Sequence, residues 1–324
     1  MTRARPAATP RRSTTRQSTL SDDLLAVSWR LEPRDYVLAH LLDQHRFLTT
    51  DQIAAVLYRS PRTCRNRLNV LRQIGFVDWF MPVHPSTGRL PVHWVPGRLS
   101  ARYVALYHGR PAPSSRALRE TRDRYPSAAT RVGHLAHADG VNQFFIDLLA
   151  YSRHHPTARL TRWWSAGRTY AKVDHNTRPD AHGVWTEDGH EVAFFLEHDT
   201  GSESHPARAE KLTGYRTLQD KGPTWPVLFW LPSTTIEANL HRHLTGLAGG
   251  TLGVRIATAA RDHAAEHGGP AGPVWRVVGN GRRRLRLAEL PGRPGPEGPF
   301  HPGPPEPDED PLYLLRGDTP PTAV

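Results

Sequence analysis

Three carboxylates stand at the ends of two neighbouring apolar stretches of the sequence. Asp180 precedes the first stretch, and Glu197 and Asp199 end the second one, Val192 to Leu196. Side chains alternate between the faces of a strand, so residues two apart share a face, and we expect Glu197 and Asp199 to point the same way. Carboxylate oxygens gathered in this way are ligands for a hard cation, so the spacing indicates a site for Mg²⁺.

A turn signal lies between the two apolar stretches. Asp188-Gly189 is typical of a tight β-hairpin, which would pair the two strands and bring Asp180 to the side of Glu197. The alternative is that all three acids are solvated residues at strand ends beside a turn, since such positions are commonly acidic. The following segment, 206–220, is predicted to be a helix with Lys211 and Tyr215 four residues apart on one face.

The composition favours a nucleic-acid partner. At 324 residues the chain is long enough for two domains, and its net charge is +11. Residues 1–110 hold 17 arginines against 7 acidic residues, which leaves +10 there and a near balance elsewhere. We therefore expect double-stranded DNA to meet the N-terminal part.

Other features exclude some classes of protein. Cys64 is the only cysteine, so a disulfide framework and a cysteine zinc site are excluded. Without an apolar stretch of about 18 residues or a secretory leader, we expect a cytoplasmic protein that does not associate with a membrane.

The N-terminal part has the pattern of a DNA-binding domain. Residues 32–47, 49–58 and 61–74 are predicted helices, the second opened by a capping box from Thr49 to Gln52 and the third by Ser60-Pro61. A strand, a turn and a second strand follow between 76 and 95, and a helix covers about 100–107. Two short helices ahead of a third match helix-turn-helix order.

The third helix has two faces. Cys64, Leu68, Leu71 and Ile74 form its apolar stripe. The opposite face carries side chains that can bond base edges in the major groove, and a further arginine lies at the turn between the strands. The candidate DNA-binding residues are Arg62, Arg65, Asn66, Asn69, Arg72 and Arg89. The alternative is a small α+β domain whose arginines only solvate a face.

We expect five segments along the chain. Residues 1–29 are predicted to be a disordered basic arm, 30–108 the DNA-binding domain, 109–130 a linker, 131–278 a second domain, and 279–324 a Pro-rich disordered tail. A long helix over 131–152 opens the second domain. It carries His134 and His137 one turn apart, and two histidines without a third ligand are more typical of partly exposed helix residues.

The second domain resembles the restriction-endonuclease-like fold, on its order of elements, its Pro179-Asp180 pair and its Glu197-x-Asp199 segment. The resemblance implies an αβββαβ domain in which Asp180, Glu197 and Asp199 are metal-binding and catalytic residues. Asp199 stands where that fold family has a lysine, and Lys211 would supply the catalytic cation instead.

The three helices and the β-hairpin of the N-terminal part resemble a winged helix. Together with the second domain, this unit is similar to the plasmid replication-relaxation family. The resemblance implies an α+β chain with disordered termini. In this chain a winged helix-turn-helix domain is followed by a restriction-endonuclease-like domain. The resemblance also implies a DNA-binding protein acting in replication-relaxation or transfer of a plasmid or mobile element. The alternatives are an active Mg²⁺-dependent DNA nuclease and a winged-helix transcription regulator with a sensing second domain. A homodimer and a replication or transfer protein are both open as partners.

Overall fold

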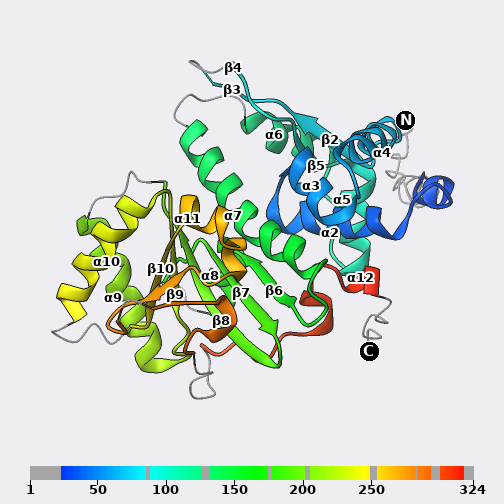
Figure 1. Ribbon diagram of the computed structural model, residues 1–324. Coiled ribbons are helices and arrows are strands. Elements are labelled where there is room, and N and C mark those ends of the chain that lie inside the picture. Colours follow the sequence, from blue (N-terminus) through cyan, green and yellow to red (C-terminus); the bar gives the residue numbers. More distant parts are fainter. Residues whose placement is uncertain are drawn as a thin grey trace, which may run out of the picture.

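The structure is a computed structural model of the 324-residue chain. It describes residues 23–84, 88–125, 131–173, 177–200, 205–248, 254–281, 283–292 and 300–316. These residues form a mixed α and β molecule in two halves, with the long helix α7 (Arg131–Ser152) running between them (Figure 1). Most of the predicted basic arm, residues 1–22, lies outside the described residues, and residues 23–28 are helical.

The first half begins with three short helices whose starts follow the predicted caps. The Thr49 hydroxyl accepts a hydrogen bond from the Gln52 backbone, and the Gln52 side chain accepts one from the Thr49 backbone, so the capping box is confirmed. The Ser60 hydroxyl caps the third helix in the same way. The helices are α2 (Pro33–His45), α3 (Thr50–Leu57) and α4 (Pro61–Gln73).

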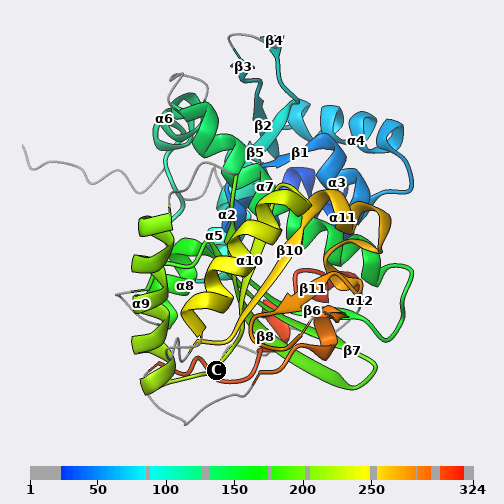
Figure 2. The ribbon, with the colours of Figure 1, turned by 60° about the vertical axis from the view of Figure 1, so that its left-hand side comes forward.

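A small antiparallel sheet supports these helices. Strand β5 (His93–Pro96) lies between β1 (Leu48–Thr49) and β2 (Val77–Phe80). A hairpin of β3 (Val83–His84) and β4 (Gly88–Arg89) extends beyond it and projects from the same end of the molecule as α4 (Figure 2). Residues 85–87 of the predicted turn lie outside the described residues. Helix α5 (Arg98–Tyr107) completes this half.

The segment predicted as a linker contains a helix, α6 (Ser115–Arg124). It buries none of its residues, which is why its sequence shows no apolar stripe. Its Arg122 guanidinium donates to the Asp78 carboxylate of β2 at 2.6 Å, so α6 lies against the small sheet. Residues 126–130 of the linker lie outside the described residues.

The second half is built on a seven-stranded sheet of order β12-β11-β10-β9-β8-β7-β6. Its strands are β6 (Arg159–Ser165), β7 (Ala181–Glu187), β8 (His190–His198), β9 (Val227–Leu231), β10 (Ile256–Ala260), β11 (Trp275–Val277) and β12 (Arg284–Leu285). The central strands β8, β9 and β10 are parallel, and the outer neighbours pair antiparallel. The predicted β7–β8 hairpin is confirmed.

Helices cover both faces of this sheet (Figure 1). On one face, α7 buries Phe144 and Phe145 in a core cluster that includes Phe194. On the other, Tyr215 of α9 (His205–Lys221) and Leu240 of α10 (Thr234–Ala248) share a core cluster with strand residues. Burial on both faces explains the continuous apolar stretches of the central strands. Three short helices complete this half: α8 (Ala166–Lys172), α11 (Arg261–Glu266) and η1 (Gly269–Ala271).

The two halves share one core. A single buried cluster includes Leu38 and Leu68 of the first half together with Phe144 of the second. The Gln52 amide donates to the Asp139 carbonyl of α7 at 3.2 Å, and the Asn142 amide of α7 donates to the Phe47 carbonyl at 2.9 Å. Independent folding of residues 30–108 and 131–278 stays a prediction.

The prediction of a disordered tail is wrong for residues 283–292 and 300–316. They form β12, η2 (Leu287–Glu289), η3 (Pro307–Glu309) and α12 (Tyr313–Arg316). The physical reason is charge: Glu309 accepts hydrogen bonds from the buried Arg162 guanidinium at 2.7 Å and from the Trp164 indole at 3.0 Å. The proline-rich composition of the tail carries no sign of this distant buried cation.

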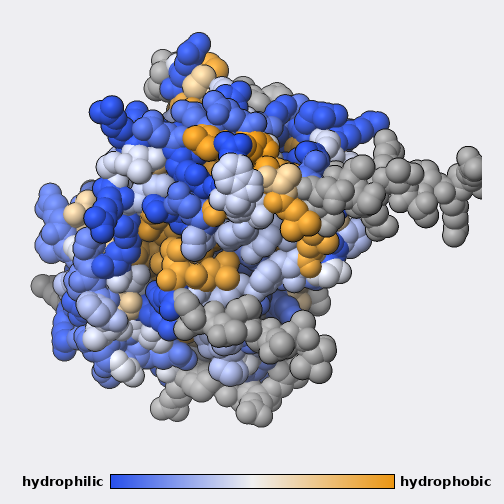
Figure 3. Space-filling view, turned by 90° about the vertical axis from the view of Figure 1, so that its right-hand side faces the viewer, coloured by the Kyte–Doolittle hydropathy of each residue, from blue (hydrophilic) through white to orange (hydrophobic). Residues whose placement is uncertain are grey.

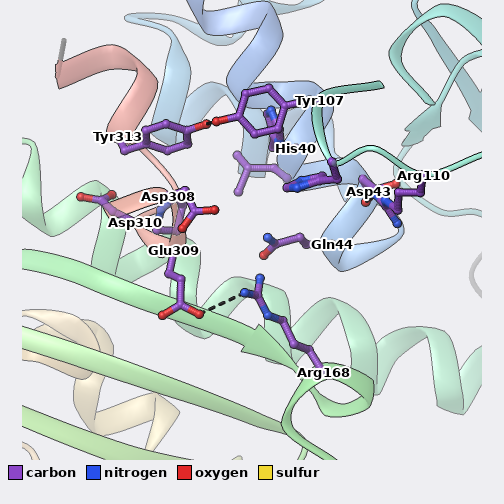
Figure 4. Close-up of a pocket in the computed structure, with 13 residues that line it drawn as sticks. His40, Asp43, Gln44, Tyr107, Arg110, Arg168, Asp308, Glu309, Asp310 and Tyr313 are labelled. Atoms are coloured by element: carbon purple, nitrogen blue, oxygen red, sulfur yellow. Dashed lines mark hydrogen bonds and ion pairs between the residues drawn. The ribbon is translucent and has the colours of Figure 1, made fainter. Parts of the chain in front are cut away.

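The tail also reaches the first half. The Tyr313 hydroxyl meets the Tyr107 hydroxyl of α5, and Glu309 points to Arg168 of α8 (Figure 4). A cavity of about 360 Å³ lies between α2, the end of α5, α8 and this part of the tail. The tail therefore connects both halves of the molecule.

We expect Glu309→Gln to lower the free energy of unfolding by about 3 kcal/mol or more, because removing one partner leaves a buried arginine charge unpaired. The Arg162 and Glu309 side chains are only 2% and 6% exposed. Urea denaturation measures the change. Glu266→Gln, at an exposed position at the end of α11, is the control. Equal stability of the two variants would contradict a structural role for the tail.

Candidate functional site

The site forms where the start of β7 lies beside the end of β8. Asp188 and Gly189 both adopt positive φ, at 52° and 78°, and close the hairpin. The register pairs Ala181 with Leu196, and the Asp180 backbone amide donates to the Leu196 carbonyl at 3.0 Å. Asp180 is thereby placed beside Glu197, as the hairpin signal predicted.

Asp180 is held by two donors. Its Oδ2 accepts from the backbone amide of His198 at 2.8 Å and lies 2.9 Å from Nε2 of His137 on α7. The hydrogen bond with the Asp180 carboxylate raises the pKa of His137 above its usual value, against the opposing effect of burial. Asp180 therefore faces the His137 ring, and its negative charge favours the protonated form of that ring.

Glu197 is the most enclosed acid of the site. It is 2% exposed, and its oxygens accept from the Lys211 ammonium at 2.8 Å and the Tyr215 hydroxyl at 2.6 Å. Burial, and after it the negative charge of Asp180, raises the pKa of Glu197 to about 7, while Lys211 and Tyr215 act in the opposite direction. The predicted shared face of Lys211 and Tyr215 is confirmed by their common partner.

Asp199 directly follows the last residue of β8 and is buried, and the predicted shared face of Glu197 and Asp199 stays a prediction. Its backbone amide donates to the Trp230 carbonyl at 3.1 Å, and its carbonyl accepts from Arg261 at 3.0 Å. The negative charge of Asp199 acts on the Arg261 guanidinium. The structure thus brings Asp180 and Glu197 together and places Asp199 next to Arg261.

His198 fills the space between the strand end and α7. Its Nε2 lies 2.9 Å from the Arg261 guanidinium, and burial lowers the pKa of His198 to about 4. A Cβ on Gly140 would come within 2.2 Å of that ring nitrogen, so α7 approaches this closely only because residue 140 is glycine. His137 packs edge-on against the same ring, with centroids 5.5 Å apart.

The donor set does not match a divalent metal centre in this arrangement. In the described part of the chain, no group of three or more His, Cys, Asp or Glu side chains is placed to hold a metal ion. Both oxygens of Glu197 already accept from Lys211 and Tyr215. Mg²⁺ binding at Asp180, Glu197 and Asp199 stays a prediction, one that requires Lys211 or His137 to give way.

The chemistry available here is proton exchange over a compensated acid pair. Lys211 and His137 are 32% and 35% exposed, whereas the carboxylates they meet are 3% and 18% exposed. Solvent therefore meets the Lys211 ammonium and the His137 ring first, and the acids lie behind them. The sequence pointed to His137 but not to its partner Asp180. It gave no indication that His198 or Arg261 takes part, because residue spacing does not show that α7 and α11 contact this strand end.

A second candidate surface is the exposed face of α4. Its predicted apolar residues Cys64, Leu68 and Leu71 are buried. All six candidate DNA-binding residues are exposed: Arg62, Arg65, Asn66, Asn69 and Arg72 on α4, and Arg89 on β4. Hydrophilic residues line the upper edge of the molecule on this side (Figure 3). Arg67 is different, because it turns inward to Asp35 at 3.2 Å.

The comparison with protein families assigns the chain. The family model described as replication-relaxation matches residues 40–229, which covers both the α4 unit and the acid pair. The chain belongs to the replication-relaxation family. No curated protein matches it. Among the described residues, no helix combines the length and the apolar character needed to cross a membrane.

The raised pKa of Glu197 gives a stability test. The folded chain holds this proton up to a pH of about 7, whereas the ordinary value is 4.5, so the folded state binds more protons between these values. The stability of the natural chain relative to Glu197→Gln should therefore fall as pH rises from 4.5 to 7. Chemical denaturation across this range measures the difference. Glu191→Gln, an exposed position on the same strand, should show no such trend.

Proposed function

We propose that this protein binds double-stranded DNA through a winged-helix unit formed by α2 to α5 and the β3–β4 hairpin. The observation that carries the proposal is the two-sided α4, whose buried stripe faces the core while its arginines and asparagines face solvent. Arginine and asparagine side chains bond guanine and adenine edges in the major groove. The +10 charge of residues 1–110 supplies attraction to the phosphate backbone.

The role that fits this binding is replication-relaxation or transfer of a plasmid or mobile element. Membership of the replication-relaxation family supports that role. The second half supports a restriction-endonuclease-like core, because α7, β6, β7, β8, α9 and β9 occur in that order, with the short helix α8 between β6 and β7, and Asp180 lies beside Glu197 at adjoining strand ends. We infer a core with weakened or absent cleavage, since Lys211 and His137 already compensate the two acids.

Replacing Arg62 and Arg65 together by alanine should weaken duplex binding. Each lost phosphate contact is expected to reduce the slope of log affinity against log salt by about 0.9. Titration of the full chain with duplex fragments at several salt concentrations measures both effects. The matched control replaces Arg216 and Arg242, which are exposed arginines on α9 and α10.

Equal loss of affinity in both double variants would show that general positive charge, and not α4, carries the binding. Mapping of the bound sites then separates two roles for the same unit. Sites at an origin of replication or transfer support the proposed role, whereas sites at promoters would favour a winged-helix transcription regulator.

We expect little or no nicking of supercoiled DNA in the presence of Mg²⁺ or Mn²⁺, because the ammonium of Lys211 lies 2.8 Å from the Glu197 carboxylate. Gel analysis of plasmid topology is the measurement. Asp180→Ala should leave duplex binding nearly unaltered, because distant sites act independently. Strong metal-dependent nicking by the natural chain that disappears in Asp180→Ala would instead identify an active nuclease.

A further inference from the structure

A groove beside the C-terminal end of α4 is lined by four arginines from three helices. They are Arg72 of α4, Arg98 at the start of α5, and Arg119 and Arg122 of α6, and they surround a cavity of about 380 Å³. Asp78 is the single acidic residue among the residues that line it. Helix α6 thus adds positive charge next to the face of α4 on which the proposed DNA contact rests.

Two of the four arginines are paired with carboxylates. Arg122 meets Asp78 at 2.6 Å, and Arg98 meets Asp23 at 2.8 Å. In the described part of the chain, neither Arg72 nor Arg119 has a carboxylate partner: the Arg72 guanidinium lies 5.1 Å from the centre of the Trp79 ring, and Arg119 is exposed. The groove therefore retains two uncompensated cations that face one cavity.

The core of the protein does not account for α6. The helix buries none of its residues, so it adds little to the free energy of folding through apolar burial. It begins with a Ser114 cap and is fixed to β2 through Arg122, which together keep Arg119 next to the groove. A helix held in this way presents the charge of Arg119 at a defined position.

We propose that this groove binds a phosphodiester group of the DNA duplex whose bases face α4. The proposal rests on the proposed function and adds α6 to the DNA-contacting surface. Guanidinium groups form bidentate hydrogen bonds with phosphate, and a phosphate here would compensate Arg72 and Arg119 together. Contacts of this kind set the register of a protein on the duplex without reading its sequence. Helix α6 is then a backbone clamp beside a base-reading helix.

The test compares two alanine variants one turn apart on α6, in the full chain. Arg119→Ala should weaken binding roughly fivefold at about 0.15 M salt and reduce the salt slope by about 0.9, equally for duplexes of different sequence. Arg116→Ala is the matched control, because Arg116 is 84% exposed, pairs with Glu120 and does not line the groove. Arg119→Lys keeps the charge and should keep the salt slope.

The outcomes separate this proposal from the proposed function. If the Arg62 and Arg65 double variant loses duplex binding while Arg119→Ala behaves like Arg116→Ala, the clamp is overturned and DNA binding by α4 stands. A loss in Arg119→Ala that is limited to one DNA sequence also overturns it, because a backbone contact carries no sequence information. If the natural chain binds no duplex, both proposals fail. Melting temperatures of all variants confirm that each remains folded.

Discussion

The buried carboxylate of Glu197 constrains the second half of the molecule more than any other group. An ionised carboxylate removed from water costs several kcal/mol unless partners compensate it. The compensation comes from α9, whose Lys211 and Tyr215 both reach the Glu197 oxygens. Asp180 comes beside Glu197 through the hairpin, and its compensation comes from His137 on α7, across the sheet from α9. The acid pair therefore ties helices on both faces to the same strand ends.

Helix α7 also connects the acid pair to the first half. Two residues after His137, the Asp139 carboxylate lies 2.8 Å from His93 of β5, and the Asn142 amide donates to the Phe47 carbonyl. Helix α7 therefore contacts both the acid pair and the small sheet that supports α4.

Local signals predicted most of the elements, and distant partners account for what was missed. The Asp188-Gly189 turn, the Thr49 capping box and the apolar stripe of α4 depend on residues close in sequence, so spacing alone located them. The partner of His137 is 43 residues away and that of Arg162 is 147 residues away. No periodicity records such pairs.

The number of arginines is a poor guide to DNA contacts, because many of them form ion pairs with acids of the same chain. Three buried acids of the second half each meet an arginine: Glu187 meets Arg286, Glu237 meets Arg284 and Glu309 meets Arg162. Such pairs contribute to the near balance of charge in that half. In the first half only Arg67 serves a fully buried acid, Asp35, among the described residues. Exposed arginines remain on α4, β4 and α6, and these three elements lie towards the same end of the molecule (Figure 2). Pairing within the fold, and not composition, therefore decides which part of a basic chain is available to DNA.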